Sequence, residues 1–181
     1  LTWIKNRDSA TAYHLLFDEV RGLNQVLHSN LANAEQGSLN NFEYNDGTLS
    51  FDGNTTWGNK PGNKYVAWCW KGGGSAVSGT GTGGASAVTY SANPNAGFSI
   101  VKYTKSGTTG TMTHGLDSAP EMIIEKRTDG AAYWNVRVAG ATNNNQTIYL
   151  NESTGVSTHP SLNLWTTPTT SVFGYDSANA T

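Results

Sequence analysis

The chain has 181 residues and a net charge of −2, and only 13% of its residues are charged. It lacks the clustered Lys and Arg that nucleic acid or anionic lipid would attract, and no apolar run approaches the roughly 18 residues of a membrane-spanning helix. Asn, Thr, Ser and Gly supply the polar character instead, and these residues favour turns and strand surfaces over helix interiors. The composition therefore predicts an all-β protein that neither binds nucleic acid nor inserts into a membrane.

The first part of the chain predicts a series of short strands, at residues 2–6, 13–17, 25–29, 42–44 and 48–52. The third of these is ambiguous, because Val20, Leu23 and Val26 are also spaced for one helical face, which Gly22 interrupts. Residues 45–47, Asn-Asp-Gly, predict a tight hairpin turn between the last two strands, since these residue types tolerate positive φ.

Residues 64–71 form the most apolar strand pattern in the chain. Alternation along the strand places Val66, Trp68 and Trp70 on one face, while the other face includes Cys69. A strand that is apolar on both faces belongs in the middle of a sandwich. We therefore expect this strand to be central, with Trp68 in the core rather than on an exposed sugar-stacking surface, and with Cys69 as a small buried residue.

Residues 72–84 consist almost entirely of Gly, Ser, Thr and Ala, which predicts a flexible connector with little surface to bury. Further strands are predicted beyond it, at residues 97–103, 111–114, 121–127, 133–138, 146–151 and 171–175. The chain thus divides into a first β module at residues 1–71, a connector at residues 72–92 and a second β module at residues 93–181.

The two modules show a weak internal repeat at an offset of about 120 residues. The matched segments keep their order along the chain: residues 3–7 with 123–127, 16–17 with 134–136, 26–30 with 148–151, and 48–51 with 171–174. A partner for the strand at residues 64–71 would fall beyond the end of the chain, so both modules look truncated. The expected fold is an antiparallel β-sandwich, jelly-roll or concanavalin-like, built from two related halves.

Several motifs carry a family resemblance: residues 3–7 (WIKNR), 20–22 (VRG), 65–71 (YVAWCWK), 92–101 (ANPNAGFSIV), 114–116 (HGL) and 119–120 (AP). In these motifs the chain resembles an uncharacterised repeat domain that is common in structural and appendage proteins of marine bacteriophages and in ocean metagenomes. The resemblance covers essentially the whole chain. It implies a tail-fibre-like virion component with a lectin-like or jelly-roll sandwich, found on the virion surface or outside cells, and it supplies no catalytic residues.

Aromatic residues are the main candidates for ligand contact, because their faces can pack on the apolar face of a sugar ring. Trp57, Trp134 and Trp165 stand in polar surroundings and are the residues expected at the surface. Asn163, close to Trp165, could add hydrogen bonds to sugar hydroxyls in a carbohydrate groove.

Glu43, Asp46 and Asp52 form the one local cluster of carboxylates that could hold Ca²⁺, although turn chemistry explains the two Asp-Gly pairs without a metal. No other cofactor is indicated. Asp18 and Glu19 could be imagined as half of a glycosidase pair, but solvated surface charge is the simpler interpretation. The four His residues lack the spacing of a zinc site.

Three functions remain open at this point. The first, and the one expected, is a non-catalytic structural or adhesive module of a phage virion or appendage, with other virion subunits, further copies of itself or a cell-surface glycan as partners. The second is a carbohydrate-binding module that uses exposed Trp residues. The third is a glycan-degrading enzyme on the same fold, which requires two facing carboxylates.

Overall fold

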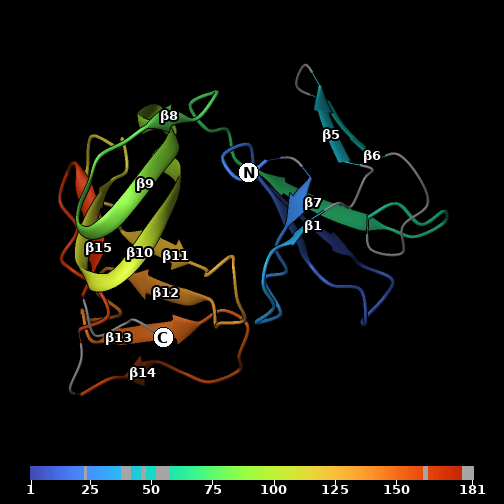
Figure 1. Ribbon diagram of the computed structural model, residues 1–181. Helices are drawn as coiled ribbons and strands as arrows, with labels where there is room; N and C mark the ends of the chain where they lie inside the picture. The colour runs from blue at the N-terminus through green and yellow to red at the C-terminus, as the bar shows by residue number, and fades with distance from the viewer. Residues whose placement is uncertain (23, 38–41, 46–47, 52–57, 161–162, 177–181) are drawn as a thin grey trace.

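The computed structural model of the chain describes residues 1–22, 24–37, 42–45, 48–51, 58–160 and 163–176. Within these residues the chain is all-β, with antiparallel strands and one short 3₁₀ helix, η1 (Pro94–Ala96). No helix in this part of the chain combines the length and apolar character needed to cross a membrane. The predicted fold class is therefore confirmed (Figure 1).

The first half contains a three-stranded sheet in the order β2-β1-β7 and two small hairpins. Its strands are β1 (Thr2–Asn6), β2 (Leu15–Phe17), β3 (Gln25–Val26), β4 (Gln36–Gly37), β5 (Phe42–Asn45), β6 (Thr48–Phe51) and β7 (Tyr65–Cys69). Alternation along β1 buries Thr2, Ile4 and Asn6 on one face. Ile4 then packs with Leu15, Phe17 and Val26 in the core of this half.

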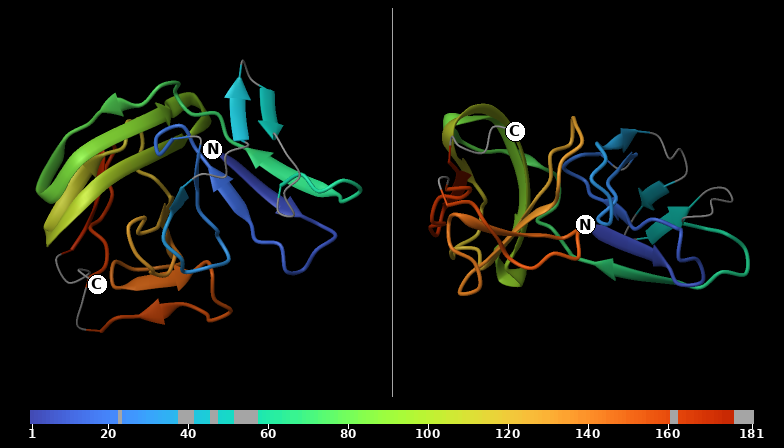
Figure 2. Two further views of the ribbon diagram at one scale, coloured as in Figure 1. Left: turned by 45° about the vertical axis from the view of Figure 1, so that its right-hand side comes forward. Right: turned by 90° about the horizontal axis from the view of Figure 1, so that it is seen from below.

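The second half is a sandwich of two four-stranded antiparallel sheets. One sheet has the order β15-β10-β9-β8 and comprises β8 (Val77–Ser78), β9 (Gly81–Asn93), β10 (Phe98–Thr113) and β15 (Val172–Tyr175). The other has the order β11-β12-β13-β14 and comprises β11 (Met122–Glu125), β12 (Asn135–Val138), β13 (Gln146–Tyr149) and β14 (Ser157–Thr158). Figure 2 shows the strands of the two sheets from two further directions. Met112 of one sheet and Ile123 of the other belong to one apolar cluster, together with Trp165.

Strand pairing confirms that the two halves are related. In the first half Gln25 pairs with Gly37 and Val26 with Gln36, while in the second Gln146 pairs with Thr158 and Thr147 with Ser157. All of these counterparts stand at one offset, close to the predicted ~120 residues. The ladder Trp3–Leu16–Leu27 corresponds in the same way to Ile124–Val136–Ile148.

Side-chain hydrogen bonds repeat with the strands. The amide of His14 donates to Asn30 Oδ1 at 3.0 Å, and the amide of Trp134, its counterpart, donates to Asn151 Oδ1 at 2.8 Å. The repeat covers β1 to β4 and β11 to β14. The predicted match of residues 48–51 with 171–174 does not extend to pairing, because β6 pairs with β5 whereas β15 pairs with β10.

The two halves are joined by Trp134, which packs against Leu16 and Leu27 of the first half. Its indole Nε1 donates to the carbonyl oxygens of His28 and Leu31, both at 3.0 Å. A large apolar side chain whose polar atom is fully satisfied can be buried at low cost. This residue therefore acts as a core residue common to both halves.

Part of the glycine-rich tract is strand, because Val77–Ser78 form β8 and residues 81–84 begin β9, so the predicted flexible connector was wrong for these residues. Residues 81–92 belong to β9, which pairs along its length with β10, and Ala85 and Val88 of β9 enter the core between the sheets. The glycines permit close approach, since a Cβ on Gly84 would lie 2.3 Å from the carbonyl oxygen of Thr108. At these positions glycine therefore indicates close packing of two strands rather than flexibility.

The predicted central strand lies at the edge of its sheet. β7 pairs with β1 alone among the described strands, and Trp68 and Trp70 are 45% and 39% exposed. Cys69, expected in the core, is also exposed. The core assignment of this strand was wrong because an apolar run does not reveal whether a second layer covers it.

Candidate functional site

An aromatic row lies at the end of β7 and just after it, formed by Trp68 and Trp70 with Trp3 and Phe98 as their ring neighbours. Trp68 is paired with Trp3 across the sheet, and their rings meet edge to face with centroids 5.8 Å apart. Trp70 stacks on Phe98, with an interplanar angle of 21° and centroids 6.2 Å apart. Trp3 is itself held by a 2.9 Å hydrogen bond from Nε1 to His14 Nδ1. The two exposed indoles are thus fixed in place by neighbours beneath and beside them.

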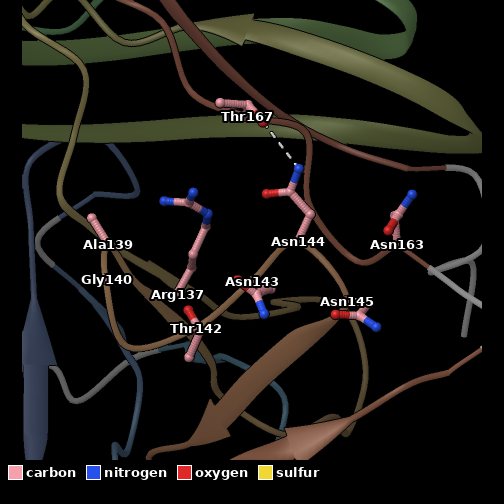
Figure 3. Close-up of a pocket in the computed structure, with 9 residues that line it drawn as sticks. All are labelled: Arg137, Ala139, Gly140, Thr142, Asn143, Asn144, Asn145, Asn163 and Thr167. Atoms are coloured by element: carbon pink, nitrogen blue, oxygen red, sulfur yellow. Dashed lines mark hydrogen bonds between the residues drawn. The ribbon is translucent and has the colours of Figure 1, made fainter.

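A second surface, the polar hollow, lies where the chain passes from β12 to β13 and has a volume of about 610 Å³ (Figure 3). Its polar lining consists of Arg137, Thr142, Asn143, Asn144, Asn145, Asn163 and Thr167. In Figure 3 the guanidinium of Arg137 and the carboxamide of Asn144 extend into the same space. The lining thus presents amides, hydroxyls and one cation, and it includes no carboxylate.

Hydrogen bonds hold the walls of the hollow in place. The Asn144 carbonyl accepts from the amides of Leu164 and Trp165 at 2.8 and 3.0 Å, which ties the β12–β13 turn to the segment that carries Asn163. The Asn144 side chain donates through Nδ2 to the Thr167 hydroxyl at 3.0 Å. The Oδ1 of Asn144 is left to accept from a ligand.

Arg137 is the only charged residue of the lining, and its environment is unusual for a cation. Its Nε is buried and has no hydrogen-bond partner among the described residues. Burial lowers the pKa of the Arg137 guanidinium from its ordinary value, because desolvation disfavours the charged form. An arginine remains protonated nonetheless, so the hollow carries a positive charge.

Trp134 and Trp165, expected at the surface, are only 4% and 2% exposed. The prediction of surface contact was wrong for both, because polar neighbours in sequence do not decide burial when strands alternate. The Nε1 of Trp165 donates to the carbonyl of Gln146 at 3.2 Å. Asn163 does line the hollow, so this residue stays a candidate. Trp57 lies outside the described residues.

The whole chain, residues 1–181, matches the family model described as a domain of unknown function (DUF7483). The chain belongs to this family. No curated protein and no solved structure matches it. The family covers both halves together, and its description states no function.

The carboxylates considered in the sequence do not form a described site. Asp18 is held by Arg21, whose Nε lies 2.5 Å from its Oδ2, so this carboxylate is engaged in an ion pair. Asp46 and Asp52 lie outside the described residues, and for Glu43 only the backbone is described. Among the side chains that the structure does describe, no three His, Cys, Asp or Glu residues are grouped as a metal site would require.

Arg137 was not singled out from the sequence. Its signal lay in the internal repeat, where it occupies the position of Phe17: Ile123 pairs with Arg137 as Thr2 pairs with Phe17. Phe17 is buried in the apolar core of the first half, so the change to arginine at this position could have been noticed from the sequence.

Proposed function

We propose that this chain is a non-catalytic adhesive module of a virion surface or appendage, and that it binds carbohydrate through the aromatic row. The observation that carries the proposal is the exposure of Trp68 in β7 and of Trp70 directly after β7, with the rings of Trp3 and Phe98 against them. Rigid indole faces stack on the apolar faces of sugar rings without losing much side-chain entropy on binding. The virion setting is supported by the resemblance of the sequence motifs to phage appendage domains.

Replacing Trp68 with alanine is expected to abolish or strongly weaken binding on a glycan array while leaving the fold intact. An aromatic contact of this kind contributes about 0.5–1.5 kcal/mol beyond area burial, so affinity should fall about tenfold or more once the stacked area is also lost. Because Trp68 is 45% exposed, its truncation should lower the free energy of unfolding by about 1 kcal/mol or less.

Tyr133→Ala is the matched control, since Tyr133 is also exposed and aromatic but lies outside the aromatic row. It should retain full binding. If Trp68→Ala and Trp70→Ala bind the same glycans as the parent, the carbohydrate proposal is wrong.

A structural role in subunit contact is a second candidate, and a separate observation favours it. Met122 and Ile124 of β11 are exposed, and β11 is an edge strand with no partner on its outer side among the described strands. Ile124 is the counterpart of Trp3 in the repeat. In the first half β7 pairs with the strand that carries Trp3, β1, whereas β11 has no such partner among the described strands. An apolar strand edge of this kind is a template for pairing with another chain.

If this edge mediates contact between identical copies, the sedimentation coefficient of the parent should rise with protein concentration. The Ile124→Lys variant should sediment as a monomer at the same concentrations. A charge at the edge opposes strand pairing without disturbing the core. Val156→Lys introduces the same charge at an exposed apolar position away from β11 and should behave as the parent does. A parent that stays monomeric at all concentrations would rule out self-association through this edge.

A further inference from the structure

The internal repeat allows one half of the molecule to be compared with the other, and at Arg137 the two halves differ in charge. Phe17, the counterpart of Arg137, is 1% exposed and packs in the apolar core of the first half. Arg137 stands on the same face of its sheet as Ile123, its neighbour across the ladder, which is buried between the two sheets. The second half therefore holds a cation at a position that folding alone would fill with an apolar side chain.

The cation is also left without a counter-charge. Its Nε is buried and unpartnered, and no hydrogen bond or ion pair joins its guanidinium to a residue in the described ranges. A buried donor without a partner destabilises the folded state, since it has lost its hydrogen bonds to water. Buried polar groups without a partner are rare in native proteins, and a bound ion or ligand beside the group is one explanation for them.

Arg21 of the first half is an arginine whose guanidinium does have partners. Its guanidinium lies 2.5 Å from the Asp18 carboxylate and 2.6 Å from the Glu35 carboxylate, and it also donates to the Leu16 carbonyl at 3.0 Å. Both arginines are partly buried near the second strand of the repeat, yet only Arg21 has its charge neutralised. The difference lies in the surroundings, because the lining of the polar hollow includes no Asp or Glu.

We propose that the polar hollow binds an acidic saccharide, with Arg137 contacting its carboxylate or sulfate. A guanidinium offers donors in a planar fork that matches both oxyanions. Asn144 Oδ1 and the Asn163 carboxamide contact the neighbouring hydroxyls. The volume of about 610 Å³ is sufficient for one or two sugar rings. This site is separate from the aromatic row and does not depend on the function proposed for that row.

The test is isothermal titration calorimetry at low ionic strength with four probes: methyl glucuronide, glucose 6-sulfate, methyl glucoside and inorganic sulfate. The parent should bind at least one of the two acidic sugars about tenfold or more tightly than the neutral glucoside and than sulfate alone. Arg137→Gln should remove that preference. Arg127→Gln should keep it, because Arg127 lies outside the hollow and is already paired with Asp129 at 2.7 Å.

Thermal unfolding separates loss of binding from loss of structure: Arg137→Gln should melt no lower than the parent, since it removes the buried Nε that has no hydrogen-bond partner. A second variant separates the two proposed sites: Trp68→Ala should keep the acidic-sugar preference, because Trp68 lies in the aromatic row and outside the polar hollow.

The proposal is overturned if the acidic and neutral sugars bind equally, if none of them binds, or if Arg137→Gln retains the preference. Inorganic sulfate binding as tightly as the acidic sugars would also overturn it, since the hollow would then recognise an anion without a sugar.

Discussion

Truncation of Trp134 to alanine should cost about 3–5 kcal/mol of unfolding free energy, the cost typical of removing a buried tryptophan. The indole is 4% exposed and contacts Leu16 and Leu27 across the joint between the halves. Its loss also leaves the carbonyls of His28 and Leu31 without their donor. A domain of this kind has a total stability of about 5–15 kcal/mol, so the variant should be close to unfolding at physiological temperature.

Chemical denaturation monitored by circular dichroism measures this effect, with Trp68→Ala as the matched control. Both variants lose the same side chain, but Trp68 is 45% exposed and should cost about 1 kcal/mol or less. Trp134→Phe should fall between the two, since it keeps much of the ring volume and loses the indole N–H. Equal destabilisation by both alanine variants would contradict the assignment of Trp134 to the core and Trp68 to the surface.

Most strands could be predicted from the sequence because their local patterns are strong. The β1 strand was predicted with its observed bounds, and β5 and β6 pair as the Asn-Asp-Gly motif between them predicted, although residues 46 and 47 of that motif lie outside the described residues. The repeat was visible as well, although pairing aligns Trp3 with Ile124 rather than with Ile123. Alternation and turn chemistry act within a few residues, so one sequence is enough to detect them.

Burial was not predictable in the same way, because it depends on which layers meet. Trp68 lies in the most apolar strand and is exposed, whereas Trp134 lies among polar residues and is buried. The indole of Trp134 finds its partners more than a hundred positions earlier in the chain, at the carbonyl groups of His28 and Leu31. No local pattern contains that information.

The candidate sites could be predicted only in part from the sequence, for a related reason. Asn163 was identified as a hydrogen-bonding residue beside Trp165, and it lines the polar hollow. The Asn-rich turn and Arg137, which complete the hollow, join it only after β12 and β13 pair. A residue-by-residue comparison of the two repeats could have revealed Arg137, since it stands where the first half has Phe17.

The glycine tract provides the other large expected effect: Gly83→Ala should destabilise the chain by about 2–5 kcal/mol. Gly83 has a φ of +58°, which costs an alanine about 1–2 kcal/mol, because its Cβ crowds the backbone in the left-handed region. The new Cβ would also lie 2.1 Å from the carbonyl oxygen of Thr109 on β10, so the two strands would have to separate. A flexible connector would tolerate the change, and a packed strand would not.

Gly155→Ala is the control, since Gly155 has nothing within 4 Å of the added Cβ. It should leave the unfolding free energy unchanged or raise it by up to about 1 kcal/mol, because alanine lowers the entropy of the unfolded chain. Hydrogen exchange on the same samples should locate the damage, with protection lost at the β9–β10 ladder in Gly83→Ala and retained at β12 and β13. If Gly83→Ala instead has the same melting temperature as the parent, β9 is not a packed strand at this point, and the prediction of a flexible connector would be correct there.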